Sequence, residues 1–212
     1  MQVDFIYQIA ILIMSVVIHE VSHGYAASFL GDQTARYQGR LTLNPLKHLD
    51  FFGSFLLPLL LYISKVGIIL GWAKPVPYNP YNLRPGRWSE AIVAFAGPAA
   101  NILLALIFGI LLRVGILTQA SWATPAFAEI TAVIVVINIL LAIFNLVPIP
   151  PLDGSKILFS LFPEKLYKVR EFLEKYGLVF IIIFICFLWQ FIFPLVGATF
   201  RLITGVAIWG LF

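Results

Sequence analysis

The chain has 212 residues, of which 61% are hydrophobic and only 11% are charged, and its formal net charge is +4. A soluble domain carries about 25% charged residues, so this composition excludes a soluble globular protein and indicates an integral membrane protein. The basic residues lie in short polar connections, which argues against a nucleic-acid surface. We expect one all-α domain over residues 1–212, a polytopic bundle of transmembrane helices.

The first apolar run, residues 5–30, is long enough to cross a bilayer as a helix that ends at Gly31. The residues before it lack the basic region of a signal peptide, so we expect the run to be retained in the mature protein. It contains a His-Glu-x-x-His motif at residues 19–23.

The histidines of this motif, His19 and His23, lie one helical turn apart on the same face. That spacing allows both imidazoles to bind a single Zn²⁺, with Glu20 beside them to take a proton from water at the metal. Ionisable side chains are costly in hydrocarbon unless they have partners, which favours a zinc site over a polar helix face in an aqueous groove. His23 is about 10 Å from the end of the helix, so the metal would lie inside the membrane near one face.

A polar stretch follows, in which we expect His48 to be a surface histidine. Residues 51–80 are apolar, but glycines and prolines interrupt them, and the prolines of residues 71–80 exclude a helix and restrict any strand to an edge. Irregular backbone is tolerated in a membrane only where protein buries it or where it lines a wet cavity. We therefore expect residues 51–80 to enter the membrane and return to the same side, as a helical hairpin or a small re-entrant β/loop element.

Two full spans come next, near residues 88–117 and 127–147, joined by a short turn. Pro98 should kink or loosen the first of them, and Asn101 should hydrogen-bond a neighbouring helix. Asn138 and Asn145 are seven residues apart, so they share a face of the second span that should point into the bundle.

A run of prolines ends that span, and a basic amphipathic connection over residues 156–175 leads to a last span near 177–194. We expect Pro194 to end this span and Cys186 within it to be packed. The tail, residues 195–212, either lies in the interface or forms a further short span.

The basic residues orient the bundle. They are concentrated before the span that begins near Trp88 and again over residues 156–175, whereas the N-terminus and the turn at 118–125 have none. If residues 51–80 return to the side from which they entered, both basic connections face the cytoplasm of a multi-pass protein in the cell membrane. The N-terminus then lies outside, and the metal lies toward the cytoplasmic face.

A catalytic zinc needs a third protein ligand and one open position. Asp153 is the first candidate, because it directly follows a span that ends at the level of His23. An equally good interpretation from spacing alone is that Asp153 caps the helix that follows it. Asp32, Asp50 and His48 are weaker ligand candidates.

These motifs together resemble the site-2 protease family of intramembrane zinc metalloproteases. The resemblance rests on the His-Glu-x-x-His motif at 19–23 and on Asn-Leu-Val-Pro-Ile-Pro-Pro-Leu-Asp-Gly at 145–154. Gly-Trp-Ala-Lys-Pro-Val-Pro at 71–77 and Ala-Gly-Pro-x-x-Asn at 96–101 are similar to two further stretches of the family. Here a Leu follows Asn145 where the family pattern often has Pro directly. We expect a compact member without a PDZ-like or CBS-like domain.

The resemblance implies that Asp153 is the third ligand of one Zn²⁺ per chain, that Glu20 is the general base and that Asn145 helps to stabilise the oxyanion. The substrates would be transmembrane proteins or peptides that are cut within the bilayer. The residues implied to receive an unwound substrate as an added strand are Gly71, Trp72, Ala73, Lys74, Pro75 and Val76.

Two other classes remain as alternatives. A zinc transporter also places histidines and carboxylates in membrane helices, but it would be expected to offer ligands along a path. An inactive family member that acts as a membrane adaptor would lack part of the chemistry, whereas every residue that the chemistry needs is present here. Nothing in the sequence sets the oligomeric state.

Overall fold

The computed structural model describes residues 5–50, 53, 56, 60, 63, 74–163 and 166–207. These residues are mostly helical and include no strand. Within this described part of the chain, three helices are long and apolar enough to cross a membrane, or up to four if a bent helix pair forms one span. The chain is therefore an all-α integral membrane protein. The three single helices that meet this test are α1 (Phe5–Phe29), α4 (Ser89–Leu117) and α5 (Pro125–Asn145).

Helix α1 ends just before Gly31, as the sequence predicts. Gly31 has φ +111°, a left-handed conformation that is open to glycine and strained for residues with a Cβ. The Gly31 amide then donates to the carbonyl of Ser28, and the Asp32 amide donates to that of Ala27. These two bonds satisfy two of the last carbonyls of the helix. A short helix, α2 (Thr34–Tyr37), and a single 3₁₀ turn, η1 (Pro45–Lys47), follow.

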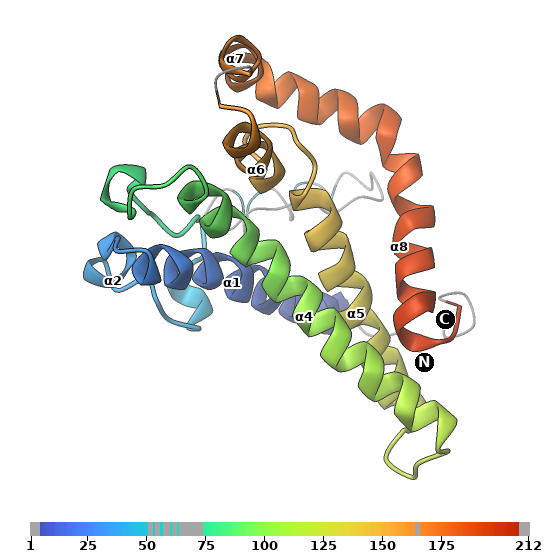
Figure 1. Cartoon of the computed structure of the whole chain (residues 1–212). Coiled ribbons are helices and arrows are strands. Elements are labelled where there is room, and N and C mark those ends of the chain that lie inside the picture. The colour runs from blue at the N-terminus through green and yellow to red at the C-terminus, as the bar shows by residue number, and fades with distance from the viewer. Residues whose placement is uncertain are drawn as a thin grey trace.

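Helices α4 and α5 run side by side, and α1 crosses and packs against both (Figure 1). The turn between α4 and α5 is as short as the sequence predicts. Thr124 caps α5, because its hydroxyl accepts a hydrogen bond from the Phe127 amide, and Pro125 occupies the first helical position. The expected kink at Pro98 does not interrupt α4, which is helical on both sides of it.

Helix α6 (Asp153–Leu161) turns back onto the bundle at the end where α5 stops and α4 begins (Figure 1). Gly154 makes this return possible. A Cβ at this position would collide with the carbonyl of Leu146 and would lie 2.6 Å from the Val147 oxygen. The start of α6 thus packs directly on the backbone at the end of α5, which brings Asp153 over the bundle.

The last part of the chain differs from the prediction. Helix α7 (Tyr167–Ile183), the π-helical turn η4 (Phe184–Leu188) and α8 (Trp189–Thr204) follow one another, with a 68° bend near η4. A π-helical turn is a recognised cause of such a bend. The expected end at Pro194 is wrong, because α8 continues through this residue.

Residues 195–204 of the tail complete α8 and join the core. The buried residues of α8 recur every four positions and face α4 and α5; they are Ile192, Val196, Phe200 and Thr204. The prediction that Cys186 is packed is also wrong, because this thiol is exposed.

The predicted re-entrant element lies largely outside the described residues, including Gly71, Trp72 and Ala73. Its described end, from Lys74 to the start of α4, is a loop that contains the 3₁₀ turn η3 (Pro80–Asn82). We call residues 74–83 the strap. Asp32 anchors its far end, because the carboxylate is fully buried and accepts hydrogen bonds from the Asn79 amide (2.8 Å) and the Asn82 side chain (3.0 Å).

Candidate metal centre

Helices α1 and α6 bring three possible ligand atoms into one small triangle. Nε2 of His19 lies 3.1 Å from Nε2 of His23, and each nitrogen lies 3.2 Å from Oδ2 of Asp153. All three side chains are at most 8% exposed. Zinc bonds of 2.0–2.1 Å in a tetrahedron place ligand atoms about 3.3 Å apart, so the triangle fits a zinc ion.

The outer nitrogens of both imidazoles are fixed by oxygen acceptors. Nδ1 of His19 lies 2.6 Å from Oδ1 of Asn101, and Nδ1 of His23 lies 2.7 Å from the carbonyl of Val93. A carbonyl only accepts, so Nδ1 of His23 carries its proton and its Nε2 presents a lone pair. With His19 in the same tautomer, the triangle consists of three acceptors, an arrangement that a cation stabilises.

Gly97 of α4 forms one wall of this triangle. A Cβ at this position would collide with Nε2 of His23 and would lie 2.7 Å from Cε1 of His19. The close approach of α4 to the histidines therefore depends on a residue without a side chain. This gives a physical reason for the glycine of the Ala-Gly-Pro motif.

The motif carboxylate, Glu20, faces the strap. Its Oε2 accepts a hydrogen bond of 2.8 Å from the Val76 amide. Pro75 and Pro77 on either side have no N–H group, so Val76 supplies the one amide donor of this tripeptide. The strap thereby fixes the position of the Glu20 carboxylate.

The other backbone groups at the start of the strap are also in use. The Lys74 amide donates to the carbonyl of His48 (2.8 Å), and Nη2 of Arg40 donates to the carbonyls of Lys74 (3.0 Å) and Pro75 (3.3 Å). Arg40 and His48 thus hold the strap in place over α1. Lys74, Pro75 and Val76, which were predicted to bind substrate, therefore make backbone hydrogen bonds within the protein.

Asp153 does not act as a helix cap. The N-cap of α6 is Leu152, and no side chain caps this helix, whereas the Asp153 carboxylate points to the two histidines. Its other oxygen, Oδ1, lies 3.9 Å from Nζ of Lys156, which also lies 5.2 Å from the centre of the Tyr78 ring. One oxygen of Asp153 thus faces the histidines and the other faces a cation.

The weaker ligand candidates form hydrogen bonds elsewhere in the protein. Asp32 accepts hydrogen bonds from the strap and from Thr34, and Asp50 accepts one from the Gly53 amide. His48 was predicted to be a surface residue, which is wrong: it is fully buried, and its Nε2 lies 2.8 Å from the Thr42 carbonyl. Among the residues that the structure describes, only His19, His23 and Asp153 form a group able to hold a metal.

The hydrogen bonds to Asp32 also change the pKa of its carboxyl group. Burial opposes ionisation, but hydrogen bonds from Thr34, Asn82 and the Asn79 amide outweigh this effect and hold the pKa of Asp32 below its usual range.

The two asparagines of α5 have different surroundings. Asn138 is fully buried in the bundle, as predicted, and bonds to Asn101. Asn145 is half-buried at the end of α5, and its Nδ2 donates to the Leu141 carbonyl of the same helix (2.9 Å). The predicted hydrogen bond of Asn101 to a neighbouring helix is confirmed. One of its partners is His19 of α1, a contact that the sequence did not indicate.

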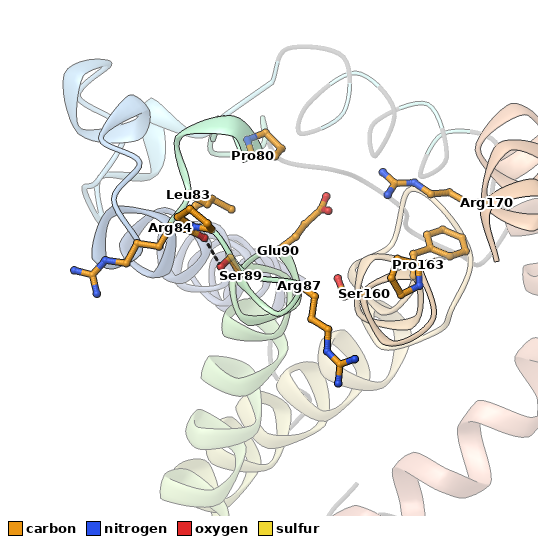
Figure 2. Close-up of a pocket in the computed structure, with 12 residues that line it drawn as sticks. Pro80, Leu83, Arg84, Arg87, Ser89, Glu90, Ser160, Pro163 and Arg170 are labelled. Atoms are coloured by element: carbon orange, nitrogen blue, oxygen red, sulfur yellow. Dashed lines mark hydrogen bonds between the residues drawn. The ribbon is translucent and has the colours of Figure 1, made fainter. Parts of the chain in front are cut away.

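A separate pocket of about 270 Å³ opens between the strap, the start of α4 and α6. Figure 2 shows Glu90 near the centre of its lining, with Arg84 and Arg87 extending away from it. The lining includes neither the three clustered side chains nor Glu20, so this pocket is distinct from the candidate metal centre.

Comparison with known proteins places these motifs in a family. The family model described as "Peptidase family M50" matches residues 7–120 and 113–188. The chain is 37% identical over 198 residues to "Putative zinc metalloprotease YwhC" of Bacillus subtilis (strain 168), covering 91% of this chain and 86% of the relative. No solved structure matches the chain.

Two mycobacterial relatives extend this finding. "Putative zinc metalloprotease Rip2" of Mycolicibacterium smegmatis is 38% identical over 152 residues, which cover 71% of this chain and 55% of the relative. Rip2 of Mycobacterium tuberculosis (strain H37Rv) is 28% identical over 184 residues, which cover 84% of this chain and 66% of the relative. The chain thus spans a little over half to two thirds of the Rip2 proteins.

The family match covers most of the chain, and the structure adds apolar membrane-crossing helices and a buried cluster that suits zinc. The chain therefore belongs to peptidase family M50, the site-2 protease family, and is a membrane-embedded zinc metallopeptidase.

Proposed function

We propose that the chain hydrolyses peptide bonds within membrane-spanning segments of its substrates, with one zinc ion held by His19, His23 and Asp153. The observation that supports this most strongly is the triangle of three buried ligand atoms, 3.1 to 3.2 Å apart. Two of these atoms belong to a helix that is long and apolar enough to cross a membrane. Chemistry at this triangle would act on a peptide bond inside the bilayer.

Bound zinc supplies Lewis-acid chemistry, since it polarises a carbonyl and lowers the pKa of water toward 7. Glu20 acts as the general base, which accepts a proton from the attacking water and passes it to the leaving nitrogen. The Val76 amide fixes the position of the Glu20 carboxylate, which follows His19 directly in the chain. Asn145 stabilises the negative oxygen of the tetrahedral intermediate, a role that rests on the family resemblance.

The substrate enters as an unwound segment, because a helix hides its carbonyls in internal hydrogen bonds. We assign its binding to the element formed by Gly71, Trp72, Ala73, Lys74, Pro75 and Val76. Since the Lys74, Pro75 and Val76 backbone is already hydrogen-bonded, a strand added here pairs with the preceding three residues or displaces Arg40 from its two carbonyls. Regulated cleavage of membrane proteins is the process that such a site would serve.

The protein lies in the cell membrane with its N-terminus outside and its zinc toward the cytoplasm. The basic residues before α4 and over residues 156–175 support this orientation, since cytoplasmic connections carry an excess of Lys and Arg.

A zinc transporter is less compatible with these observations. Within the described parts of the chain, potential ligands gather in one group and do not follow a path across the bundle. An inactive adaptor is disfavoured because the motif glutamate, Glu20, is present and the Val76 amide orients its carboxylate.

The test is Glu20→Gln in purified protein reconstituted with a transmembrane peptide that contains a Gly-Pro break. The variant is expected to retain its zinc and to lose cleavage, because the amide cannot accept the proton. The matched variant is Glu90→Gln, which changes a glutamate outside the metal cluster. Undiminished cleavage by Glu20→Gln would contradict the proposal, and zinc flux into vesicles would favour the transporter.

A further inference from the structure

A chain of buried polar side chains continues from His19 into the bundle. Asn101 of α4 accepts from His19 Nδ1 (2.6 Å), and its Nδ2 donates to Oδ1 of Asn138 (2.8 Å). Nδ2 of Asn138, on α5, donates in turn to Oγ of Ser15 on α1 (2.9 Å). Asn101 and Asn138 are fully buried and Ser15 is 4% exposed. Three helices thus meet through polar groups directly behind one of the metal-site histidines.

Two backbone carbonyls determine which way both amides face. The Ser15 carbonyl lies 3.3 Å from Nδ2 of Asn101, and the Ile134 carbonyl lies 2.9 Å from Nδ2 of Asn138. Carbonyl oxygens only accept, so each must face an NH₂ group. Asn138 therefore turns its oxygen toward Asn101, and Asn101 turns its oxygen toward His19.

The orientation of Asn101 sets the tautomer of His19. An oxygen at this position requires a proton on Nδ1, which leaves a lone pair on Nε2 inside the triangle. If Asn101 rotated and presented its NH₂ group, Nδ1 would have to accept and Nε2 would carry the proton. A protonated Nε2 cannot bind a metal.

We propose that Asn138 and Ser15 are positioning residues of the zinc site, which hold Asn101 in the one orientation that keeps His19 competent to bind metal. This inference rests on the proposed ligand role of His19. The alternative is that Asn138 and Ser15 only join helices, as polar side chains often do in membranes. The two roles differ in one measurable respect, because loss of helix joining alone would lower stability without weakening zinc binding by the folded protein.

The experiment measures zinc affinity of the full chain in detergent by competition with a chromophoric chelator. Asn138→Leu removes the acceptor for Asn101 at similar volume, and zinc is expected to bind about 10-fold more weakly, as for other losses of an outer partner. Ser15→Ala removes one of the two acceptors of Nδ2 of Asn138 and leaves the Ile134 carbonyl in place, so it perturbs the fold less and should weaken zinc binding by a smaller factor. It supplies the answer if Asn138→Leu fails to fold.

The diagnostic comparison pairs zinc affinity with thermal unfolding in excess chelator. Loss of helix joining alone would lower the melting temperature of the metal-free protein and leave zinc affinity unchanged, whereas loss of the positioning role weakens zinc binding by the folded protein. The matched control is Thr131→Val, which removes another buried polar group of α5, seven residues before Asn138, and should leave zinc affinity unchanged.

One result would overturn the inference: equal zinc affinity for Asn138→Leu and Thr131→Val or, where Asn138→Leu does not fold, for Ser15→Ala and Thr131→Val. Asp153→Ala, measured in parallel, separates this inference from the proposed function. If Asp153→Ala also binds zinc normally, the ligand assignment itself fails. If Asn138→Leu binds zinc normally and Asp153→Ala does not, the ligand assignment stands and the positioning role is wrong.

Discussion

Replacing Gly97 by alanine should remove zinc from the site while leaving the helix intact. The added Cβ would lie 2.6 Å from Cε1 of His23 and 2.7 Å from Cε1 of His19, whereas carbon atoms in contact are about 3.5 Å apart or more. Both rings must therefore move by about 1 Å, several times the 0.2 Å that a metal site tolerates. We expect zinc to bind at least about 100-fold more weakly.

The measurement is chelator competition on the full chain in detergent, together with thermal unfolding in excess chelator. Alanine gains about 1 kcal/mol over glycine inside a helix, which offsets part of the overpacking cost of 1–3 kcal/mol, so the metal-free protein should change little. The control is Gly197→Ala in α8, because a Cβ there meets nothing within 4 Å. Wild-type zinc affinity in Gly97→Ala would refute the assigned position of the metal.

Three further predictions concern the ligand, the orientation and the strap. Asp153→Ala should bind markedly less zinc by metal analysis, and full retention with unchanged affinity would remove this residue from the ligand set. After replacement of Cys186, cysteines placed at Thr118 and at Lys165 should be labelled from opposite sides of the membrane, whereas labelling from one side would contradict the proposed topology. Asp32→Asn should lower thermal stability at neutral pH. Since the folded pKa of Asp32 lies below its unfolded value, the carboxylate contribution is present above about pH 4 and disappears as pH falls through the lowered pKa, so the difference from wild type should shrink in acid. A difference that grows in acid would contradict this.

The sequence predicted the main helices well, because long apolar runs with few charges leave little choice of structure in a membrane. Gly31 ended α1 as expected, and the start of α5 lies two residues from its predicted position. These features depend on local chemistry: a glycine with positive φ, a threonine cap and a proline in the first turn.

The ligand set was only partly predictable from residue spacing. An aspartate at the start of a helix serves equally well as a cap, so Asp153 could be preferred only through the family resemblance. What brings it to the histidines is the contact of Gly154 with the end of α5, which is a tertiary feature. The link from His19 through Asn101 to Asn138 likewise joins three helices and has no signature in the order of residues.

The errors have tertiary causes as well. Proline at position 194 removes one helical hydrogen bond, yet α8 continues because Ile192, Val196 and Phe200 are buried against the bundle. The sequence places His48 in a polar loop and so predicts an exposed side chain. In the folded protein the loop that follows α1 buries this side chain, and the His48 carbonyl accepts a hydrogen bond from the strap.

The central claim is that this zinc site cuts a peptide bond inside the membrane, and the position of the cut tests it most directly. A transmembrane substrate with a helix break should be cleaved in reconstituted vesicles, and mass spectrometry of both products should locate the bond. His23 lies about 10 Å from the end of α1, so we predict a cut within roughly the cytoplasmic third of the bilayer. A cut well outside the membrane-spanning segment would contradict it.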